Sequence, residues 1–186
     1  VPPRSDRWHT SPTPTMGGVA IAAGTIAGFA AIVARPDLMG APTDWHPVLL
    51  AALAMFVVGI LDDRFQLSPL AKLVASLAIG AFLVFALAGV EPDGALPSLF
   101  TLVAMIWFGG ICHAMNLLDN MDGLATGVGL IAAIFLAALF AGLLGPALVV
   151  LLTALAGALL GFLYWNRSRA RLFMGDSGSL FIGALL

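Results

Sequence analysis

Two carboxylates lie between two long apolar segments of this chain, within Asn-Leu-Leu-Asp-Asn-Met-Asp-Gly at residues 116–123. Asp119 and Asp122 are three residues apart, and Asn116 precedes Asp119 by three. A persisting helical turn would therefore direct these side chains from one face. Oxygen groups at this spacing suit a divalent cation or a phosphate. The structural alternative is that Asp122 caps a helix beginning at Gly123, with Asp119 as a solvated loop acid.

A second group of charges stands where one apolar segment ends and the next begins. Asp62 and Asp63 follow the apolar segment 47–61, and Lys72 lies about one turn into the next segment if a helix begins at Pro69. A lysine so close to an apolar core usually extends its ammonium towards water. From the same position it can also reach phosphate oxygens.

Two glycine-containing stretches add backbone donors. Gly17 and Gly18 begin the first apolar segment, where they allow backbone amides to approach a ligand closely, although an ordinary loop explains them as well. Gly-Asp-Ser-Gly-Ser at 175–179 opens the last apolar segment. Asp176 or Ser177 is an ordinary N-cap in one interpretation; in the other, the helix start binds an anion.

These acids, the lysine and the glycine-rich helix start are the components of magnesium-assisted phosphoryl transfer. That chemistry depends on positioning and charge neutralisation more than on a strong nucleophile. The sequence has no evident Ser/His/Asp or Cys/His constellation, and its histidines (His9, His46 and His113) have no metal-ligand spacing. His113 lies three residues before Asn116 and could line the same pocket, but we expect it to be a packed or interfacial histidine.

The composition indicates whether the chain folds in water or in a membrane. Hydrophobic residues make up 61% of the 186 residues and charged residues 10%, with a mean hydropathy of +1.05, whereas soluble domains are about 45–50% apolar. An integral membrane protein is therefore predicted. A net charge of −2 gives no indication of nucleic-acid binding, which needs basic stripes. The single cysteine, Cys112, excludes an internal disulfide and a cysteine-built metal site.

We predict an all-α, polytopic transmembrane helix bundle with six complete spans and a truncated seventh. A single helix from 123 to 165 would be roughly 64 Å long, about twice the hydrocarbon core, so Gly145-Pro146 is predicted to be a turn. The predicted spans are 17–34, 47–61, 69–90, 96–115, 123–145 and 146–165, with a seventh beginning at Gly178 and cut off at Leu186.

The loops sort by charge. Six spans place the segments 1–16, 62–68, 116–122 and 166–177 on one side of the membrane. Counted with Lys72, this side holds seven of the eight basic residues, and the other side holds only Arg35. The excess of positive charge predicts that the first side is cytoplasmic. Five acids recur on it at span ends, namely Asp62, Asp63, Asp119, Asp122 and Asp176.

Four motifs in order carry a family resemblance. They are Pro-Thr-Pro-Thr-Met-Gly-Gly (12–18), Gly-Ile-Leu-Asp-Asp-Arg (59–64), Asn-Leu-Leu-Asp-Asn-Met-Asp-Gly-Leu-Ala (116–125) and Phe-Met-Gly-Asp-Ser-Gly-Ser-Leu (173–180). Together they resemble the polyprenyl-phosphate N-acetylhexosamine-1-phosphate transferases over nearly the whole chain. The resemblance implies transfer of a sugar-1-phosphate from a UDP-N-acetylhexosamine to a membrane polyprenyl phosphate, releasing UMP. It also implies Mg²⁺, with Mn²⁺ as a substitute, at the cytoplasmic face of the bacterial inner membrane.

The same resemblance implies roles for the metal and nucleotide residues. Asp176 and Asn116 would be the magnesium ligands. Lys72 would be the cation on the diphosphate of the UDP-sugar, and Asp122 a contact to the uridine.

Further roles follow for the remaining residues. Asp62 and Asp63 would handle the polyprenyl phosphate and help to hold the metal site, while Asp119 shapes the pocket. Asn166 matches an asparagine of the family and would bind substrate. Arg169-Ala170 stands where Pro-Ala is usual in the family, so the loop after Asn166 departs from the family pattern.

The motifs look more like the N-acetylglucosamine branch, which initiates envelope polysaccharides such as lipopolysaccharide and teichoic acids. The alternative branch transfers phospho-N-acetylmuramoyl-pentapeptide for the cell wall. A divalent-cation transporter would place polar groups near the middle of its spans, whereas every acid here is at an end. A CDP-alcohol phosphatidyltransferase needs further acids soon after Asp122, and the next acid in this chain is Asp176.

We expect residues 1–186 to be a single transferase domain that is part of a longer protein. The last apolar segment contributes nine residues, roughly 14 Å of helix, against about 30 Å for a span. The resemblance implies a span before Val1, and further spans with a histidine-rich loop after Leu186. A homodimer is compatible with the sequence, and no nucleic-acid partner is expected.

Overall fold

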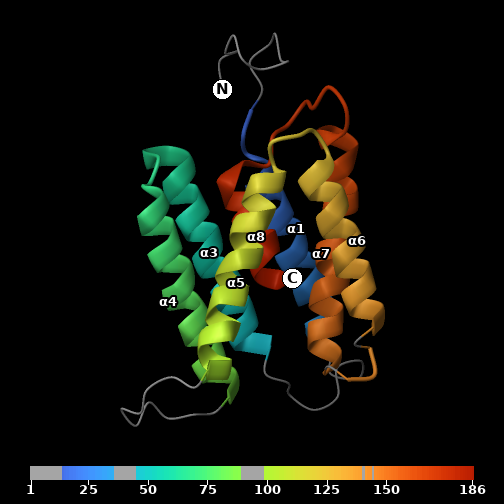
Figure 1. The fold of residues 1–186 in the computed structure, drawn as a ribbon. Helices are drawn as coiled ribbons and strands as arrows, with labels where there is room; N and C mark the ends of the chain where they lie inside the picture. The colour runs from blue at the N-terminus through green and yellow to red at the C-terminus, as the bar shows by residue number, and fades with distance from the viewer. Residues whose placement is uncertain (1–13, 36–44, 89–98, 140, 144) are drawn as a thin grey trace.

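The computed structural model describes residues 14–35, 45–88, 99–139, 141–143 and 145–186, and these ranges contain seven helices and no strand (Figure 1). The helices are α1 (Gly17–Val33), α3 (Trp45–Phe65), α4 (Pro69–Ala88), α5 (Leu99–Leu118), α6 (Leu124–Leu139), α7 (Pro146–Asn166) and α8 (Gly175–Leu185). The predicted all-α fold is confirmed.

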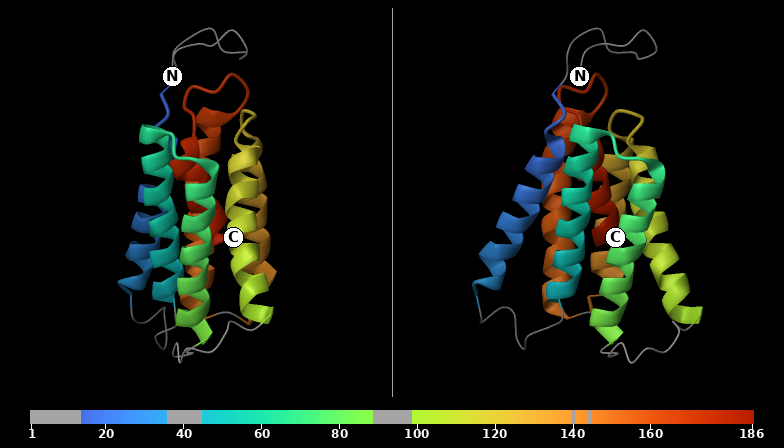
Figure 2. Two further views of the ribbon diagram at one scale, coloured as in Figure 1. Left: turned by 60° about the vertical axis from the view of Figure 1, so that its left-hand side comes forward. Right: turned by 90° about the vertical axis from the view of Figure 1, so that its left-hand side faces the viewer.

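The shortest helix, α8, occupies the centre of the bundle. The views in Figures 1 and 2 show it enclosed by the longer helices, and it packs against α1, α3, α5 and α6. Every residue from 177 to 185 is buried. A helix buried on all faces is held by its neighbours rather than by its own propensity, so the outer helices are organised around α8.

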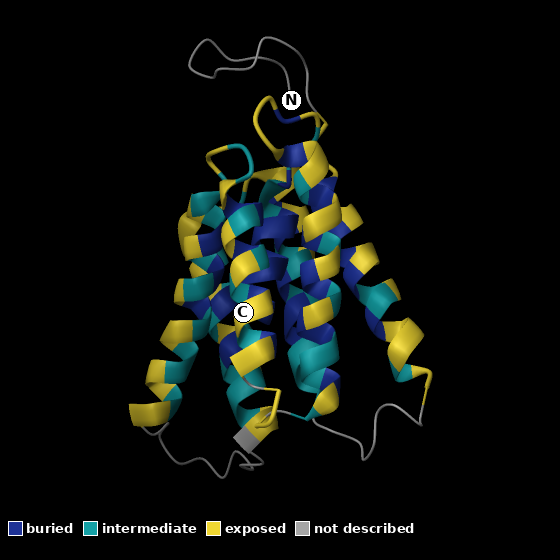
Figure 3. Ribbon diagram, turned by 90° about the vertical axis from the view of Figure 1, so that its right-hand side faces the viewer, coloured by how far each residue is buried: buried dark blue, intermediate teal, exposed yellow. Residues whose placement is uncertain are grey.

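The outer helices carry apolar side chains on their outward faces. Figure 3 shows exposed positions along the outside of the bundle and buried positions towards its axis. Large hydrophobic residues such as Leu70, Phe100, Trp107 and Ile131 are exposed. An apolar outside around an apolar inside suits lipid, because contiguous exposed apolar patches of this extent are rare in soluble proteins.

The prediction of six complete spans is confirmed only in part. In the part of the chain that the structure describes, three segments are long and apolar enough to cross a membrane, namely Pro69–Leu87, Leu99–Leu118 and Pro146–Asn166. Two shorter apolar helices, α1 and α6, run beside them. The helix α3 has 21 residues but ends in charged residues. Among the described residues, three of the six helices other than α8 therefore meet the length and hydropathy of a span.

Three predicted boundaries shift in the structure. The helix α3 continues to Phe65 and α5 to Leu118, so Asp62, Asp63 and Asn116 lie within last turns rather than in loops. The helix α8 begins at Gly175 instead of Gly178. A prediction from hydropathy places the end of an apolar segment at its first polar residue. The helical backbone hydrogen bonds continue past that residue where its side chain finds a partner. The predicted Gly145-Pro146 turn is confirmed, with Pro146 as the first residue of α7.

The helix α8 approaches α3 at backbone distance. A Cβ atom built on Gly59 would lie 2.4 Å from Ser177 Cα and 2.5 Å from the Asp176 carbonyl oxygen. These are backbone atoms of the first turn of α8 and cannot move aside as a flexible side chain can. Gly59 is therefore required for α8 to dock.

We predict that Gly59→Ala destabilises the protein by about 1–3 kcal/mol or more, because overpacking here displaces α8. Gly161→Ala is the matched control, since a Cβ atom there meets nothing within 4 Å, and we expect it to be nearly neutral. The measurement is the thermal unfolding midpoint of the detergent-solubilised protein. Equal midpoints for the two variants would contradict the close approach of α3 and α8.

Candidate active site

The described site residues collect at one end of the bundle. This end holds the last turns of α3, α5 and α7 and the first turns of α1, α4, α6 and α8 (Figure 1). The basic residues there are Arg64, Lys72, Arg167, Arg169 and Arg171, while Arg35 follows α1 at the other end; Arg4 and Arg7 lie outside the described residues. The prediction that 62–68, 116–122 and 166–177 share one side is confirmed.

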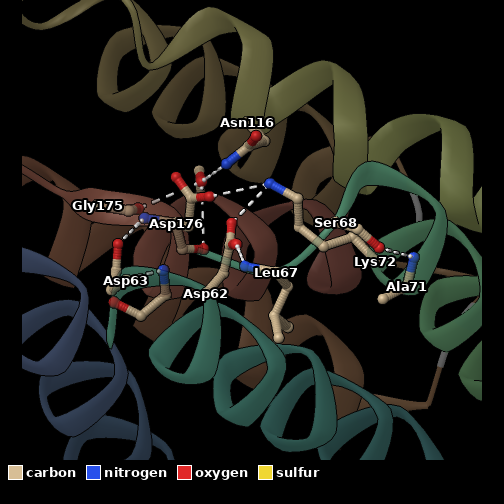
Figure 4. A network of polar contacts seen from close by, with 11 residues as sticks. Asp62, Asp63, Leu67, Ser68, Ala71, Lys72, Asn116, Gly175 and Asp176 are labelled. Carbon is tan, nitrogen blue, oxygen red and sulfur yellow. Dashed lines mark hydrogen bonds and ion pairs between the residues drawn. The ribbon is translucent and has the colours of Figure 1, made fainter. Parts of the chain in front are cut away.

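Lys72 joins three helices through its ammonium group. Its Nζ lies 2.6 Å from Asp62 Oδ2 and 3.3 Å from Asp176 Oδ2, so α4 is linked to α3 and to α8 (Figure 4). The Lys72 side chain is 18% exposed and that of Asp62 6%. The ammonium is therefore directed into the site instead of extending to bulk water. The desolvated ion pair needs both partners, because either charge alone would be buried without compensation.

Asp62 also shapes the turn that delivers Lys72. Its Oδ1 accepts the Leu67 N–H at 2.7 Å, just after α3 ends, where Gln66 has a φ of 54°. Ser68 then caps α4 by accepting the Ala71 N–H at 3.2 Å. The carboxylate of Asp62 thus binds Lys72 with one oxygen and holds the α3–α4 turn with the other.

Asp63 caps α8 from another helix. Its Oδ1 accepts the Asp176 N–H at 2.9 Å and its Oδ2 accepts the Ser177 N–H at 3.1 Å (Figure 4). The N-cap position itself is Met174, which has no side-chain capping bond. The interpretation of Asp176 or Ser177 as the N-cap is therefore wrong. The negative charge of Asp63 complements the free amides and the dipole of this helix start.

Asn116 contacts α8 at the next turn. Its Nδ2 donates to Ser179 Oγ at 3.0 Å, and the Ser179 hydroxyl lies 3.3 Å from the carbonyl oxygens of both Gly175 and Asp176. In Figure 4 the nitrogen of Asn116 faces the Asp176 group. The last turn of α5 is thereby tied to the first turn of α8.

Asp119 and Asp122 do not share a helical face. The helix α5 ends at Leu118, and residues 119–123 form turns before α6. Asp122 Oδ2 accepts the Ala170 N–H at 3.0 Å, so Asp122 holds the segment that follows α7. The two acids belong to one turn yet have different partners, because the helical turn that would align them does not persist.

Burial raises the pKa of Asp119 to about 7. Repulsion from Asp176, Asp63 and Asp122 acts in the same direction, and the Gly175 backbone N–H opposes it by stabilising the anion. A carboxyl group with this pKa changes its charge near neutral pH. Perturbed groups of this kind are concentrated at functional sites.

Asn166 is occupied by protein partners. It is 3% exposed, and its Oδ1 accepts from the Gly123 N–H at 3.1 Å and from Thr126 Oγ1 at 2.8 Å. Its Nδ2 donates to the Leu172 carbonyl oxygen at 3.1 Å. The structure therefore gives Asn166 an internal bonding role, and the substrate contact that the resemblance implied stays a prediction.

Gly17 and Gly18 also differ from the prediction. Their N–H groups donate to the carbonyl oxygens of Phe173 and Met174 at 3.0 and 2.8 Å, so these amides are not free for a ligand. A Cβ atom on Gly18 would lie 2.4 Å from the Gly178 nitrogen. Both glycines serve the close packing of α1 against the segment that leads into α8.

The donor set for a metal ion consists of oxygen atoms. No group of three or more His, Cys, Asp or Glu side chains is arranged as a metal cage among the described residues. Mg²⁺ does not require such a cage, because it keeps several waters and is held by one or two carboxylates together with substrate phosphates. The Asp176 side chain is 33% exposed and fits this pattern. Asn116 fits it only if its amide turns, since its nitrogen faces the acidic group.

The sequence analysis did not single out several polar residues that complete the site. Ser179 and Thr126 are fully buried and bond to predicted site residues. Ser76 is also fully buried, and its Oγ lies 3.2 Å from His113 Nε2. The sequence could have indicated them, because each is a serine or threonine in an apolar helix one turn after a predicted site residue.

The structure thus shows a bundle of apolar helices with an acid–lysine site at one end, and comparisons with known proteins identify its family. The family model described as glycosyl transferase family 4 matches residues 45–186. The chain belongs to this family, and the resemblance found in the sequence is confirmed.

Similar proteins are named as transferases that act with a polyprenyl phosphate and N-acetylglucosamine. The chain is 36% identical over 208 residues to a decaprenyl-phosphate N-acetylglucosaminephosphotransferase of Mycobacterium tuberculosis, covering 99% of this chain and 51% of the relative. It is 34% identical over 193 residues to a probable undecaprenyl-phosphate N-acetylglucosaminyl 1-phosphate transferase of Bacillus subtilis, covering 97% and 51%.

The other branch is also similar. A phospho-N-acetylmuramoyl-pentapeptide-transferase of a Synechococcus species is 40% identical over 199 residues, covering 95% of this chain and 53% of the relative. The chain therefore spans about half the length of the curated relatives it matches.

The pKa of Asp119 predicts a pH-dependent stability. Between pH 4 and pH 7 the unfolded chain ionises this group while the folded protein does not, so stability is lost as pH rises to about 7 and is constant above it. Asp119→Asn should then be more stable than the parent by on the order of 4 kcal/mol at pH 8 and equal to it at pH 4. Thermal midpoints in EDTA across this range are the measurement. A gap that is the same at both ends would contradict a raised pKa.

Proposed function

We propose that the protein containing this chain transfers an N-acetylhexosamine-1-phosphate from a UDP-sugar to a polyprenyl phosphate at the membrane and releases UMP. The observation that carries the proposal is the junction at Lys72, where one ammonium meets Asp62 and Asp176 at the ends of three helices. Lys72 offers a positive charge to a diphosphate, and Asp176, the partly exposed one of its two carboxylate partners, offers oxygens to a metal ion. The names of the relatives support the lipid acceptor.

Lys72 is assigned to the diphosphate of the donor. Its ammonium has three donor hydrogens, and two of its directions are taken by Asp62 and Asp176. The third remains for a phosphate oxygen. Asp62 is too deeply buried to meet a lipid phosphate and would be repelled by one; its role is to hold Lys72.

Asp176 and Asn116 are assigned to magnesium. Magnesium, with manganese as a substitute, would neutralise the charge that develops on the transferring phosphate. Asp176 offers its carboxylate at the open end of α8, and Asp63 fixes the backbone of that turn. Asn116 would turn its amide to present an oxygen, with the Ser179 hydroxyl as donor to the same oxygen.

Asp122 is assigned to the uridine of the donor. Asp119, whose pKa lies near neutrality, is assigned to the wall of the substrate pocket. The proposal includes N-acetylglucosamine as the sugar, because relatives named for that sugar match nearly the whole chain. The site would face the cytoplasm of the bacterial inner membrane, since five basic residues gather at this end. The product would initiate an envelope polysaccharide.

Transfer of phospho-N-acetylmuramoyl-pentapeptide is the second candidate, favoured by the 40% identity to a relative named for it. The two donors share the UDP group and differ in the sugar substituent. Residues beyond this chain can decide between them, because it spans about half of each relative.

The proposal predicts Mg²⁺-dependent exchange of labelled UMP into UDP-N-acetylglucosamine by the full-length protein in the presence of polyprenyl phosphate. Asp176→Asn should abolish exchange while the protein remains folded, because the backbone N–H groups bound by Asp63 are unchanged. Arg64→Gln, an exposed change in the last turn of α3, is the control. Exchange only with the UDP-muramoyl-pentapeptide would favour the second candidate. No exchange with either donor would exclude both.

Lys72→Met should raise the KM for the UDP-sugar about 10- to 100-fold, because a charge-assisted contact to the diphosphate is lost. The change also leaves the buried Asp62 without its cation, which costs roughly 3–5 kcal/mol. Lys72→Met with Asp62→Asn separates the two effects: stability should recover while the KM remains high. If the double variant recovers the parental KM, Lys72 acts only as the partner of Asp62.

A further inference from the structure

A buried polar junction lies behind the site, between α6 and α7. Asn166 accepts from the Gly123 N–H and from the Thr126 hydroxyl through one oxygen, and donates to the Leu172 carbonyl through its nitrogen. The amide orientation is determined by its partners, because an N–H can only donate and a carbonyl can only accept. Thr126 is fully buried. Its hydroxyl therefore donates to Asn166 and meets no solvent.

This junction connects the two loops that carry site acids. Gly123 has a φ of +74°, in the left-handed region, and directly follows Asp122. Leu172 lies in the segment between α7 and α8, and the same segment is held a second time by Asp122 through the Ala170 N–H. The junction and this second bond together fix where Asp122 stands.

We propose that Thr126 is a positioning residue for the nucleotide subsite. It acts by holding Asn166 and, through Asn166, both the turn at 119–123 and the segment at 167–174. The inference rests on the proposed function in one respect, the assignment of Asp122 to the uridine. It gives Asn166 the same indirect role, since both lone pairs of its oxygen are used inside the protein.

The test replaces the Thr126 hydroxyl by a methyl group. Thr126→Val keeps the shape of the side chain and removes one of two donors to Asn166. Thr25→Val in α1 is a matched control: Thr25 is equally buried, and its hydroxyl donates to the carbonyl oxygen of Ile21 in its own helix at 2.8 Å. Both variants lose one buried hydrogen bond, but only the first loses a bond between segments.

With the full-length protein, Thr126→Val should raise the KM for the UDP-sugar about tenfold, because small displacements of a binding group have large effects. The Mg²⁺ concentration for half-maximal rate should stay within about twofold of the parent, since Asp176 is held separately by Asp63. Thr25→Val should change neither quantity. In an Asn166→Ala background, Thr126→Val should have no further effect on the KM, because the two residues act as one unit.

Hydrogen exchange gives a readout that does not depend on activity. Thr126→Val should speed the exchange of the Gly123 and Ala170 amides about fivefold or more, and Thr25→Val should leave them unchanged. A parent protein that shows no transfer would count against the proposed function, and the exchange result would still decide the positioning role. An unaltered KM in Thr126→Val, an equal rise in Thr25→Val, or unchanged exchange at both amides would overturn the inference.

Discussion

Polar groups at the ends of tightly packed apolar helices must find partners within the protein, and in this bundle they find one another. The helix α8 imposes the constraint, because it is enclosed on every side and its first turn carries free backbone amides and a carboxylate. Asp63 satisfies the amides, Lys72 pairs with the carboxylate, and Asn116 contacts the following turn. Without these partners the burial of α8 would leave polar groups uncompensated, which costs more than most single packing contacts.

The site has two parts that share one backbone segment. The first is the charged junction around Lys72, which serves the metal ion and the diphosphate. The second is the neutral junction around Asn166, which positions Asp122. The segment at 167–174 connects them, since it begins at the neutral junction and leads into the first turn of α8. The first turn of α8 is nevertheless held separately by Asp63, so the two parts are joined by the chain but positioned by different bonds.

Much of the fold and of the site's membership could be predicted from the sequence. The apolar segments predicted the outer helices, and the spacing of charges predicted that the acids and Lys72 gather at one end. The boundaries were less accurate at α3, α5 and α8, where polar residues continue the helix into the site. Asp63, Asn166, Gly17 and Gly18 were assigned to ligands, and in the structure they bond to protein groups. A motif shows that a residue matters and does not show what it touches.

The sequence by itself was enough to predict a membrane environment, an all-helical fold and the gathering of the charged residues at one end. Hydropathy and charge follow from the residue types along the chain and do not depend on which residues meet in space. Only the tertiary structure decided the pairings. Asp63 and Asp176 are separated by more than a hundred residues, and so are Lys72 and Asp176. Thr126 and Asn166 are forty apart. Such pairs form because α8 enters the centre of the bundle, and no periodicity in the chain encodes which buried donor will meet which acceptor there.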